Sequence, residues 1–276
     1  MNRHGTPPAG LLSLDRACLR RAGGEVGPFD LTVAAGERIA VLGPSGAGKS
    51  TLLGMLSGER APTEGVVSLG GRSVTTGVAG SWPLADLARH RAVLPQSHQV
   101  AFGLPVEAVV ALGRVARRAD PQLAQVVDAA LALANAAHLR GRRIDTLSGG
   151  EQARVQLARV FAQLWHEQGG LLLLDEPLSA LDPGLQLELL DVIRRFARRR
   201  EHALIAVLHD VNQALSSFKR LWLVRDGALV ADVPSGRAAV PLLEALYGVT
   251  LRCVERPGDA LAVVPERRSG RVEALC

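Results

Sequence analysis

The chain has few aromatic residues: five Phe, three Trp and one Tyr among 276 residues. Its core must therefore be aliphatic, built mainly from Leu, Val and Ala. A surface that stacks bases would have little material, because such surfaces depend on aromatic side chains. The composition thus argues against proteins that bind single-stranded nucleic acid.

Cysteines and long apolar runs are also scarce. Cys18, Cys253 and Cys276 form no C-x-x-C pair, so neither a disulfide framework nor a zinc site is predicted, and a reducing compartment fits. The first ten residues contain no apolar signal-peptide core. Apolar runs such as Leu171–Leu174 are far shorter than the roughly 20 residues of a membrane span. We therefore expect a soluble or peripheral protein.

Lysine is almost absent, since Lys49 and Lys219 are the only two and the other 30 of the 32 cations are arginine. A GC-rich genome accounts for such a bias, and the net charge of +5 is a weak pointer to nucleic acid or anionic lipid. With 47% apolar and 21% charged residues, the chain is expected to form a globular fold of about one to two domains.

A strand, a glycine-rich loop and a helix follow one another early in the chain. Ile39–Leu42 has the pattern of a buried strand, and Leu52–Leu56 has helical spacing that stops at Gly58. The loop before that helix comprises Gly43, Pro44, Ser45, Gly46, Ala47, Gly48, Lys49, Ser50 and Thr51. Strand, glycine loop and helix are the context of a phosphate-binding loop, whereas a merely structural turn needs neither flanking element.

The residue types in this loop suit the phosphate chain of a nucleotide. Gly43, Gly46 and Gly48 allow backbone N–H groups to point at phosphate oxygens, and the following helix directs its positive end to the same place. Lys49 supplies a charge for the β- and γ-phosphates, and Ser50 supplies a hydroxyl for Mg²⁺. The loop therefore predicts a site for ATP and Mg²⁺.

Polar side chains follow two further strand-like runs. Leu171–Leu174 reads as a strand of a parallel sheet buried on both faces, followed by Asp175 and Glu176, and Ala203–Leu208 is a second such run, followed by His209. Open parallel sheets place ligand groups at the carboxyl ends of their strands. We expect Asp175 to bind Mg²⁺, Glu176 to polarise an attacking water, and His209 to reach that water or the γ-phosphate. The alternatives are a helix-capping acid pair and a core histidine.

A second pair of glycines stands at the start of a later helix, expected over Leu147–Trp165. Ser148 and Glu151 have the spacing of a capping box. Gly149 and Gly150 are poor helix formers and are not explained by capping, but they suit the close approach of an anion to a helix N-terminus. The sequence thus contains a second candidate anion cradle.

The rest of the chain predicts short elements. Short strand-like pieces and loops are expected from Val66 to Pro95. Residues 105–140 are expected to be helical, in Val106–Leu112 and 122–137, and a further helix is expected over 184–199. Asp226-Gly227 predicts a hairpin, and about 240–264 should hold a short helix and a hairpin around Pro257-Gly258.

Together these motifs resemble the ATP-binding cassette (ABC) family of transport ATPases. The resemblance covers about residues 12–250 and includes six motifs in the family's order. They are Gly43–Thr51 as Walker A, Gln96 as the Q-loop, Leu147–Glu151 as the signature, Asp175-Glu176 as the end of Walker B, Ser179–Asp182 as the D-loop and His209 as the switch histidine.

The resemblance implies the α/β fold of a P-loop NTPase cassette. This fold has a RecA-like core with a mixed sheet, an antiparallel β subdomain and an inserted helical subdomain. It implies a single ATPase domain at 12–250, with the helical subdomain at about 97–148, and a C-terminal tail at 251–276.

The resemblance also assigns roles to individual residues. The catalytic residues would be Glu176, His209 and Gln96; the metal would be held by Ser50, Gln96 and Asp175; ATP would contact Walker A, Ser148, Gly149, Gly150, Glu151 and Asp182. Two cassettes of the family pair head-to-tail, so a homodimer is expected in which the signature of one copy covers ATP on the other. A lone subunit should be a poor ATPase.

The partners that the resemblance implies are two transmembrane permease subunits and, indirectly, a periplasmic substrate-binding protein. Gln96 and the helical subdomain would sense the permease. The chain would then be a peripheral protein on the cytoplasmic face of the inner membrane, and no nucleic acid is expected as a partner.

One position departs from the family pattern. An aromatic residue usually stacks on adenine, but here the position falls at Arg21 or Arg20. A guanidinium can stack on a base plane, so Arg21 is a candidate substitute, and weaker selectivity that tolerates GTP would follow. The alternative is an ordinary surface arginine.

Val106–Arg114 resembles the first helical segment of the iron-chelate, cobalamin and haem importers. Further segments resemble the haemin-import ATPases of that group in particular; they are Ala92–Gln96, Ala101-Phe102, Gln156–Trp165 and Leu242–Val249. Haemin is the expected cargo, with a ferric siderophore or cobalamin as alternatives. A permease-free ABC ATPase acting on nucleic acid or ribosomes is the third reading, although such proteins commonly carry two cassettes or long coiled coils.

Overall fold

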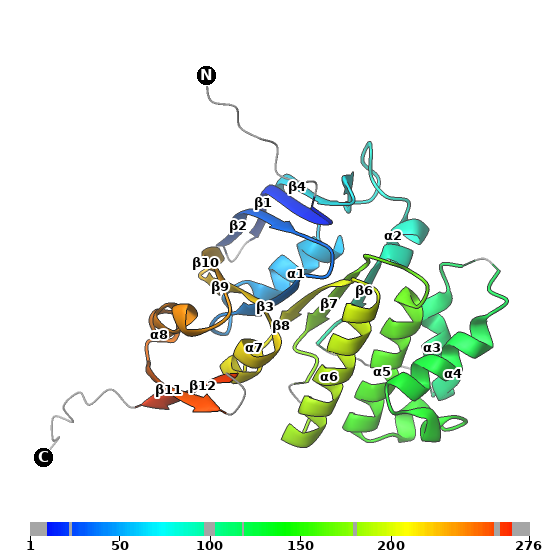
Figure 1. Ribbon diagram of the computed structural model, residues 1–276. Helices are drawn as coiled ribbons and strands as arrows, with labels where there is room; N and C mark the ends of the chain where they lie inside the picture. Colours follow the sequence, from blue (N-terminus) through cyan, green and yellow to red (C-terminus); the bar gives the residue numbers. More distant parts are fainter. Residues whose placement is uncertain are drawn as a thin grey trace, which may run out of the picture.

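A computed structural model describes residues 10–21, 24–96, 103–117, 119–178, 181–256 and 260–266. Within these residues a six-stranded mixed sheet separates a layer of helices from an antiparallel sheet (Figure 1). This arrangement agrees with the predicted α/β fold with a mixed sheet and an antiparallel β layer.

The mixed sheet carries the site. Its strand order is β10-β9-β3-β8-β7-β6, and all neighbours are parallel except β10 and β9. The strands are β3 (Arg38–Leu42), β6 (Arg91–Leu94), β7 (Leu171–Asp175), β8 (Ala203–Val207), β9 (Arg220–Arg225) and β10 (Ala228–Pro234). The predicted turn Asp226-Gly227 joins β9 to β10 with both residues at positive φ, 51° and 80°, which is the geometry of a two-residue hairpin turn.

The second sheet is antiparallel and has the order β2-β1-β4-β5. Its strands are β1 (Leu12–Arg21), β2 (Gly24–Val33), β4 (Glu64–Leu69) and β5 (Arg72–Ser73). It packs over α1 (Lys49–Ser57) on one face of the mixed sheet, and that helix ends at Gly58, as predicted.

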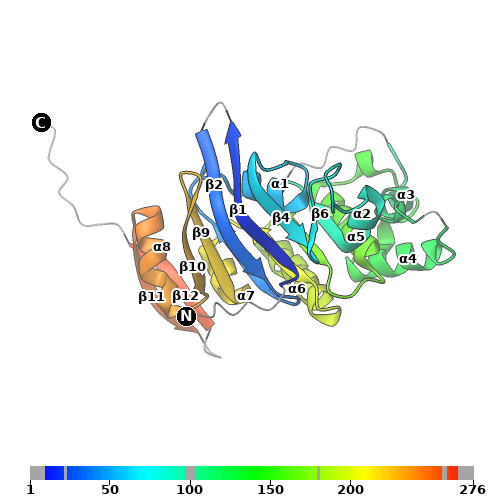
Figure 2. The ribbon, with the colours of Figure 1, turned by 90° about the horizontal axis from the view of Figure 1, so that it is seen from above.

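The helix α2 (Leu84–His90) buries Leu87 in the same cluster as α1. The remaining helices cover the opposite face or extend from the ends of the molecule. They are α3 (Val106–Ala111), α4 (Leu123–Leu133), α5 (Gly149–Leu164), α6 (Pro183–Arg199), α7 (Val211–Ser217) and α8 (Val240–Tyr247). Both ribbon views place α3 and α4 at one end and α8 with the hairpin β11 (Thr250–Arg256) and β12 (Ala260–Glu266) at the other (Figures 1 and 2).

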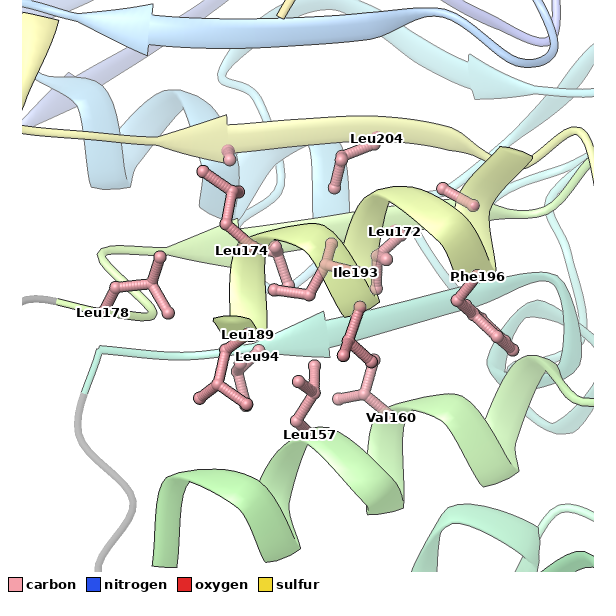
Figure 3. Close-up of a cluster of buried hydrophobic side chains, with 14 of the residues drawn as sticks. Leu94, Leu157, Val160, Leu172, Leu174, Leu178, Leu189, Ile193, Phe196 and Leu204 are labelled. Carbon is pink, nitrogen blue, oxygen red and sulfur yellow. The ribbon is translucent and has the colours of Figure 1, made fainter. Parts of the chain in front are cut away.

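The core has two halves because successive residues of a strand face opposite sides of the sheet. Leu171 and Leu173 belong to the cluster beneath the antiparallel sheet, whereas Leu172 and Leu174 belong to the cluster beneath the helices. Figure 3 shows this second cluster, where leucines of the strands meet Ile193 of α6 and other side chains of α5 and α6. Four consecutive leucines are therefore all buried, as an unalternating run predicts.

Three predicted elements differ in detail. The region 66–95 was expected to hold only strand-like pieces and loops, but it includes the helix α2. The predicted helix over 122–137 ends at Leu133, since Asn135 adopts a left-handed φ of 54°. The predicted C-terminal hairpin is present, although its turn residues Pro257 and Gly258 lie outside the described residues. The proposed domain limits stay a prediction.

Candidate functional site

The loop Gly43–Gly48 joins β3 to α1 and requires glycine at specific points. A Cβ on Gly43 would lie 2.0 Å from the carbonyl oxygen of Val224, so no side chain fits there. Gly46 and Gly48 have φ of 78° and 98°, a region that L residues with side chains rarely adopt. Gly48 is the N-cap of α1 and provides no side-chain cap, so the first N–H groups of the helix remain for another acceptor.

Lys49 lies inside this loop and is only 6% exposed. Its Nζ donates to the carbonyl oxygens of Gly43 and Pro44, each at 2.8 Å. Burial lowers the pKa of Lys49, and the nearby Glu176 and Asp175 partly offset that effect. The loop therefore holds a cation at its centre with its backbone wrapped around it.

Ser50 and Asp175 meet between α1 and the end of β7. The Ser50 hydroxyl donates to Oδ1 of Asp175 at 3.3 Å. Burial raises the pKa of Asp175, and the neighbouring Glu176 adds to this while the Ser50 hydrogen bond opposes it. A hydroxyl and a carboxylate held this close are the oxygen donors that Mg²⁺ prefers.

Glu176 follows Asp175 with a left-handed φ of 48°, unusual for a residue with a side chain. Its Oε2 accepts a hydrogen bond of 2.8 Å from Nε2 of Gln96, and its Oε1 lies 2.5 Å from Nε2 of His209. The Glu176 side chain is 12% exposed and that of His209 is 50% exposed. The carboxylate is thus held from two sides, by residues from the ends of β6 and β8.

These groups line one cavity of about 310 Å³, except Asp175, which is linked to the lining through its hydrogen bond with Ser50. Its lining is Arg21, Ser45, Gly46, Ala47, Gly48, Lys49, Ser50, Thr51, Gln96, Glu176 and His209. The phosphate loop, the carboxylates and His209 were predicted to lie together, and the structure brings them together. The motif residues Gly43 and Pro44 take part through their carbonyl oxygens on Lys49.

Arg21 extends from this cavity into a neighbouring one. Its guanidinium donates to Oγ1 of Thr51, and it also lines an adjoining space of about 600 Å³ together with Glu25 and Gly227. Arg20 instead forms ion pairs with Glu25 at 3.1 Å and Glu64 at 2.7 Å. Of the two arginines considered at this position, only Arg21 faces the site.

The second cradle lies apart from the first. Ser148 caps α5 as predicted: its Oγ accepts from the Glu151 N–H at 3.3 Å, while Oε2 of Glu151 accepts from the Ser148 N–H at 2.8 Å. A Cβ on Gly149 would meet nothing within 4 Å, although one on Gly150 would lie 2.8 Å from Leu185. No residue of this cradle is among the described residues that line the 310 Å³ cavity.

Asp182 is exposed and caps α6, where its Oδ1 accepts from the Leu185 N–H at 3.0 Å. Ser179 and Ala180, the other polar and small residues of the predicted D-loop, lie outside the described residues. The Asp182 carboxylate therefore has a structural task within the chain, which leaves its contact with ATP a prediction.

Two glutamines that the sequence did not single out connect this region to α7, the helix that follows His209. Gln186 donates to the carbonyl oxygens of Leu178 and Leu181 at 3.0 and 2.9 Å, and Gln213 donates to Oε1 of Gln186 at 2.6 Å. Gln213 lies on α7, which begins two residues after His209. No sequence motif marked either residue, because the contact joins two helices that are separated in the chain.

No helix in the described part of the chain is long and apolar enough to span a membrane. The described residues also contain no cluster of three or more His, Cys, Asp or Glu side chains suited to a metal. A metal at Ser50 and Asp175 would therefore need further oxygen ligands from elsewhere, as Mg²⁺ bound to a nucleotide commonly has.

Comparison with known proteins matches residues 26–179 to a family model described as ABC transporter. The hemin import ATP-binding protein HmuV of Pseudomonas aeruginosa is 47% identical over 220 residues, which cover 79% of this chain and 84% of that protein. HmuV of Pseudomonas entomophila is 42% identical over 251 residues and covers 90% of this chain and 96% of its own.

Solved structures with low sequence identity share the fold. A metal-chelate-type ABC transporter in an inward-facing conformation aligns with a TM-score of 0.74 at 23% identity, covering 93% of this chain and 97% of that one. CbiO1 of Clostridium perfringens, part of the ABC transporter complex CbiONQ, aligns with a TM-score of 0.70 at 22% identity, covering 87% and 93%.

Proposed function

The chain belongs to the ABC transporter family, and from that premise we propose that it is the ATP-hydrolysing subunit of a bacterial haemin importer. The observation that carries the proposal is the convergence of the loop around Lys49 with Glu176, Gln96 and His209 on one cavity. A phosphate cradle beside a carboxylate that can activate water is what ATP hydrolysis requires.

ATP would bind with its phosphates in the loop Gly43–Thr51. Lys49 would exchange its hydrogen bonds to the Gly43 and Pro44 carbonyls for bonds to phosphate oxygens. The first N–H groups of α1, which have no side-chain cap, would donate to the phosphates as well. The cation is already desolvated, so an anionic ligand recovers electrostatic energy that water cannot supply there.

Ser50 and Asp175 fit a Mg²⁺ ion, because they present a hydroxyl and a carboxylate oxygen 3.3 Å apart, and Gln96 would add an amide oxygen. When bound, the ion neutralises charge on the β- and γ-phosphates. The raised pKa of Asp175 is consistent with a carboxylate held for a cation that the chain itself does not provide.

Glu176 would act on the water that attacks the γ-phosphate. Its carboxylate would accept the proton of that water, while Gln96 and His209, which already hold its two oxygens, would orient the carboxylate and contact the water or the γ-phosphate. The water oxygen would bond to the γ-phosphorus while the bond from that phosphorus to the β,γ-bridging oxygen breaks, so ADP leaves with the bridging oxygen and inorganic phosphate is formed. The proton taken from the water would rest on Glu176 until it passes to phosphate or solvent.

Ser148, Gly149, Gly150 and Glu151 would act on the nucleotide of a second copy, and Asp182 would lie at the same interface. The support is geometric: Ser148 and Gly149 are exposed, a Cβ on Gly149 would meet nothing within 4 Å, and these residues do not line the cavity of their own chain. A head-to-tail homodimer would place each signature over the other copy's Walker A loop and close both sites.

Transport requires partners in the membrane. We assign the chain to the cytoplasmic face of the inner membrane, where the homodimer would bind two permease subunits, with a periplasmic binding protein acting indirectly. The helical subdomain at about 97–148, with α3 and α4 at one end of the molecule, would contact the permease (Figures 1 and 2).

Haemin is favoured as cargo by the hemin-import relatives at 47% and 42% identity. A ferric siderophore or cobalamin would use the same ATP chemistry, because the permease and binding protein select the cargo.

The test is a pull-down of tagged Glu176→Gln protein from its native membranes in the presence of ATP. Because this variant should bind ATP without hydrolysing it, the closed dimer should stay on its permease. We expect a polytopic permease in the pull-down and haemin-stimulated ATPase activity when the wild-type complex is reconstituted in vesicles. Siderophore or cobalamin stimulation instead would correct the cargo. Recovery of ribosomal or DNA-associated proteins without a permease would overturn the transport proposal.

The shared site can be tested by mixing two inactive variants. Lys49→Ala disables the Walker A loop and Gly149→Val blocks the signature, so each homodimer has two damaged sites. A mixed dimer would contain one intact site, and ATPase activity should reappear on mixing. A mixture as inactive as its components would contradict the head-to-tail arrangement.

A further inference from the structure

A second large cavity, of about 740 Å³, lies at the amino ends of the parallel strands, opposite the nucleotide loop. Its lining is Ala35, Gly36, Glu37, Arg38, Arg198, Glu201, Lys219, Arg220, Asp232, Val233 and Pro234. Arg38 begins β3, Lys219 immediately precedes β9, and Arg198 lies in the last turn of α6. The volume is within the usual range of about 300–1,000 Å³ for small-molecule sites.

Part of the charge in this cavity is internally neutralised. The Arg220 guanidinium lies 3.1 Å from Oε1 of Glu37 and 2.6 Å from Oδ2 of Asp232. Oε2 of Glu37 also accepts a hydrogen bond from the Ala34 N–H at 2.7 Å. This group of one cation and two carboxylates needs no ligand.

The remaining charge is positive. Arg38, Arg198 and Lys219 face the cavity with only Glu201 as a further acid, and within the described part of the chain none of these three cations has a hydrogen bond or ion pair from its side chain. Arg38 is half-buried, whereas Arg198 and Lys219 are exposed. Burial lowers the pKa of Arg38, and repulsion from Arg194 and Arg198 lowers it further.

A structural explanation covers only part of this arrangement. Arg198 and Arg199 stand in the last turn of α6, where cations interact favourably with the helix dipole. That effect does not account for Arg38, which starts a strand of the sheet, or for Lys219, one of only two lysines in a chain with 30 arginines. Neighbouring like charges beside a partly desolvated guanidinium are unfavourable unless an anion joins them.

We propose that this cavity binds a phosphate-bearing anion through Arg38, Arg198 and Lys219. Guanidinium groups donate two parallel hydrogen bonds to phosphate oxygens, and the lysine adds a point charge. The anion is either a free phosphate compound or the phosphate of a lipid headgroup. The site does not depend on the proposed ATPase function.

Such a ligand would contact the far ends of two elements that lead to the nucleotide site. The strand β3 runs from Arg38 to the Walker A loop, and α6 runs from its cap Asp182 to Arg198. Occupation of the cavity would therefore hold the amino end of β3 against the carboxyl end of α6.

The first test uses inorganic pyrophosphate as the probe in isothermal titration calorimetry. In wild-type protein pyrophosphate should occupy two sites, the Walker A loop and this cavity. Lys49→Ala should remove the first and keep the second. The double variant Arg38→Gln/Arg198→Gln should remove the second and keep the first, with at least about a tenfold loss of affinity, as expected for losing charge-assisted hydrogen bonds.

Two further variants sharpen this result. Arg195→Gln is the matched control, because it removes an exposed arginine of the same helix that does not line the cavity, and it should leave both sites intact. Glu201→Gln removes the one unpaired acid and should tighten the second site a few-fold. If Lys49→Ala does not fold, the change from two sites to one in the double variant still tests the proposal.

The source of the phosphate is tested with vesicles of phosphatidylcholine, with and without phosphatidylglycerol. Sedimentation with the anionic vesicles that is lost in Arg38→Gln/Arg198→Gln, without a second pyrophosphate site, would support a headgroup. A second pyrophosphate site that the double variant removes would support a free phosphate compound. The proposal is overturned if the double variant binds both pyrophosphate and anionic vesicles as the wild type does.

Discussion

At the carboxyl end of the mixed sheet, polar side chains contact one another at an open cavity, as Gln96, Glu176 and His209 do. At the amino end of the same sheet the polar groups are enclosed by packing or face a different cavity. The two histidines make the difference plain. His209 is half-exposed and touches a carboxylate, whereas His202 is 0% exposed and its Nδ1 accepts the Gly170 N–H at 2.9 Å.

This contrast shows that a residue type does not define a role; its position on the strand does. His202 lies just before β8 and packs with its ring 5.2 Å from that of Phe196, so it serves the core. His209 follows the same strand, where the loops of a parallel sheet meet and leave room for a ligand. If position decides the role, substitutions at the carboxyl end of the sheet should change ATPase activity, and substitutions at the amino end should change stability.

The largest effect is expected from Glu176→Gln at the carboxyl end. Removing the proposed general base should lower the kcat of ATP hydrolysis about 10²–10⁴-fold, while nucleotide affinity is retained because the phosphate-binding loop is intact. Phosphate release and equilibrium binding of ATP measure the two quantities. Glu188→Gln is the control, since that carboxylate pairs with Arg154 at 3.0 Å outside the cavity. Equal losses of kcat in Glu176→Gln and Glu188→Gln would contradict the proposed role of Glu176.

Asp175→Asn should change activity and stability in opposite directions. ATPase activity should fall about 10–100-fold, the effect of losing a charged partner for the nucleotide-bound cation. Stability without nucleotide should rise at neutral pH, because burial raises the pKa of Asp175 and so disfavours its ionised form in the folded state.

The sign of the Asp175 effect can be checked against pH. The carboxyl titrates at 3.8 when unperturbed, so above that pH the folded state binds more protons at this site than the unfolded state. Wild-type stability should therefore fall relative to Asp175→Asn as the pH rises from 3.8 through the folded pKa. Thermal unfolding of both proteins without nucleotide measures this, and a variant less stable than wild type at pH 7 would contradict it.

At the amino end, His202 should make stability depend on pH. Burial lowers its pKa from 6.5 to about 4, so the unfolded state binds more protons between these values and stability falls as the solution is acidified. The full effect is about 3 kcal/mol, of which about 2 kcal/mol should be lost between pH 7 and pH 5.

Urea unfolding at the two pH values tests this in matched variants. His202→Gln should lose most of the decrease in the free energy of unfolding that the wild type shows between pH 7 and pH 5, although the substitution destabilises the fold at pH 7. His209→Gln should lose ATPase activity, whereas the folded fraction of His202→Gln should retain it. If the two variants exchanged these properties, the assignment of one histidine to the core and the other to the site would be wrong.

The sequence predicted the carboxyl end of the sheet better than the amino end, for a physical reason. The unalternating run Leu171–Leu174 identifies a strand buried on both faces, and the residue types that follow such strands indicate where ligands bind. The amino end has no comparable rule. The cavity around Arg38 and Arg198 depends on the packing of a helix end against strand starts, and no motif reports that packing.

Short elements and long-range contacts also escaped prediction. The seven residues of α2 are too few to establish a helical period, so that region read as strand pieces and loops. The hydrogen bond between Gln213 and Gln186 joins residues 27 apart, and it forms only because α6 and α7 are brought together by the sheet. The capping box at Ser148, by contrast, was predicted, since both of its hydrogen bonds lie within four residues.

The smallest effect concerns Arg21, at the margin of the carboxyl-end site. Arg20 pairs in register with Glu25 across β1 and β2 and is held in ion pairs, while Arg21 reaches Thr51 and lines both cavities around the loop. A guanidinium can lie flat on a purine but distinguishes adenine from guanine poorly, because it stacks without reading the base edge.

Arg21→Tyr should therefore strengthen ATP binding modestly, by the roughly 0.5–1.5 kcal/mol of an aromatic stack, or about 2- to 12-fold. Competition binding of ATP and GTP to wild type and variant measures the change, and Arg20→Tyr is the matched control, since its side chain points to Glu25 and Glu64 instead. If Arg20→Tyr gave the larger gain, the base would lie over the other face of β1, and the adjoining 600 Å³ cavity would not be the purine site. We expect the wild type to bind ATP and GTP with equal affinity and Arg21→Tyr to favour ATP. Because the two proteins differ only at position 21, that result would show that this residue accounts for the weak base selectivity predicted from the missing aromatic residue.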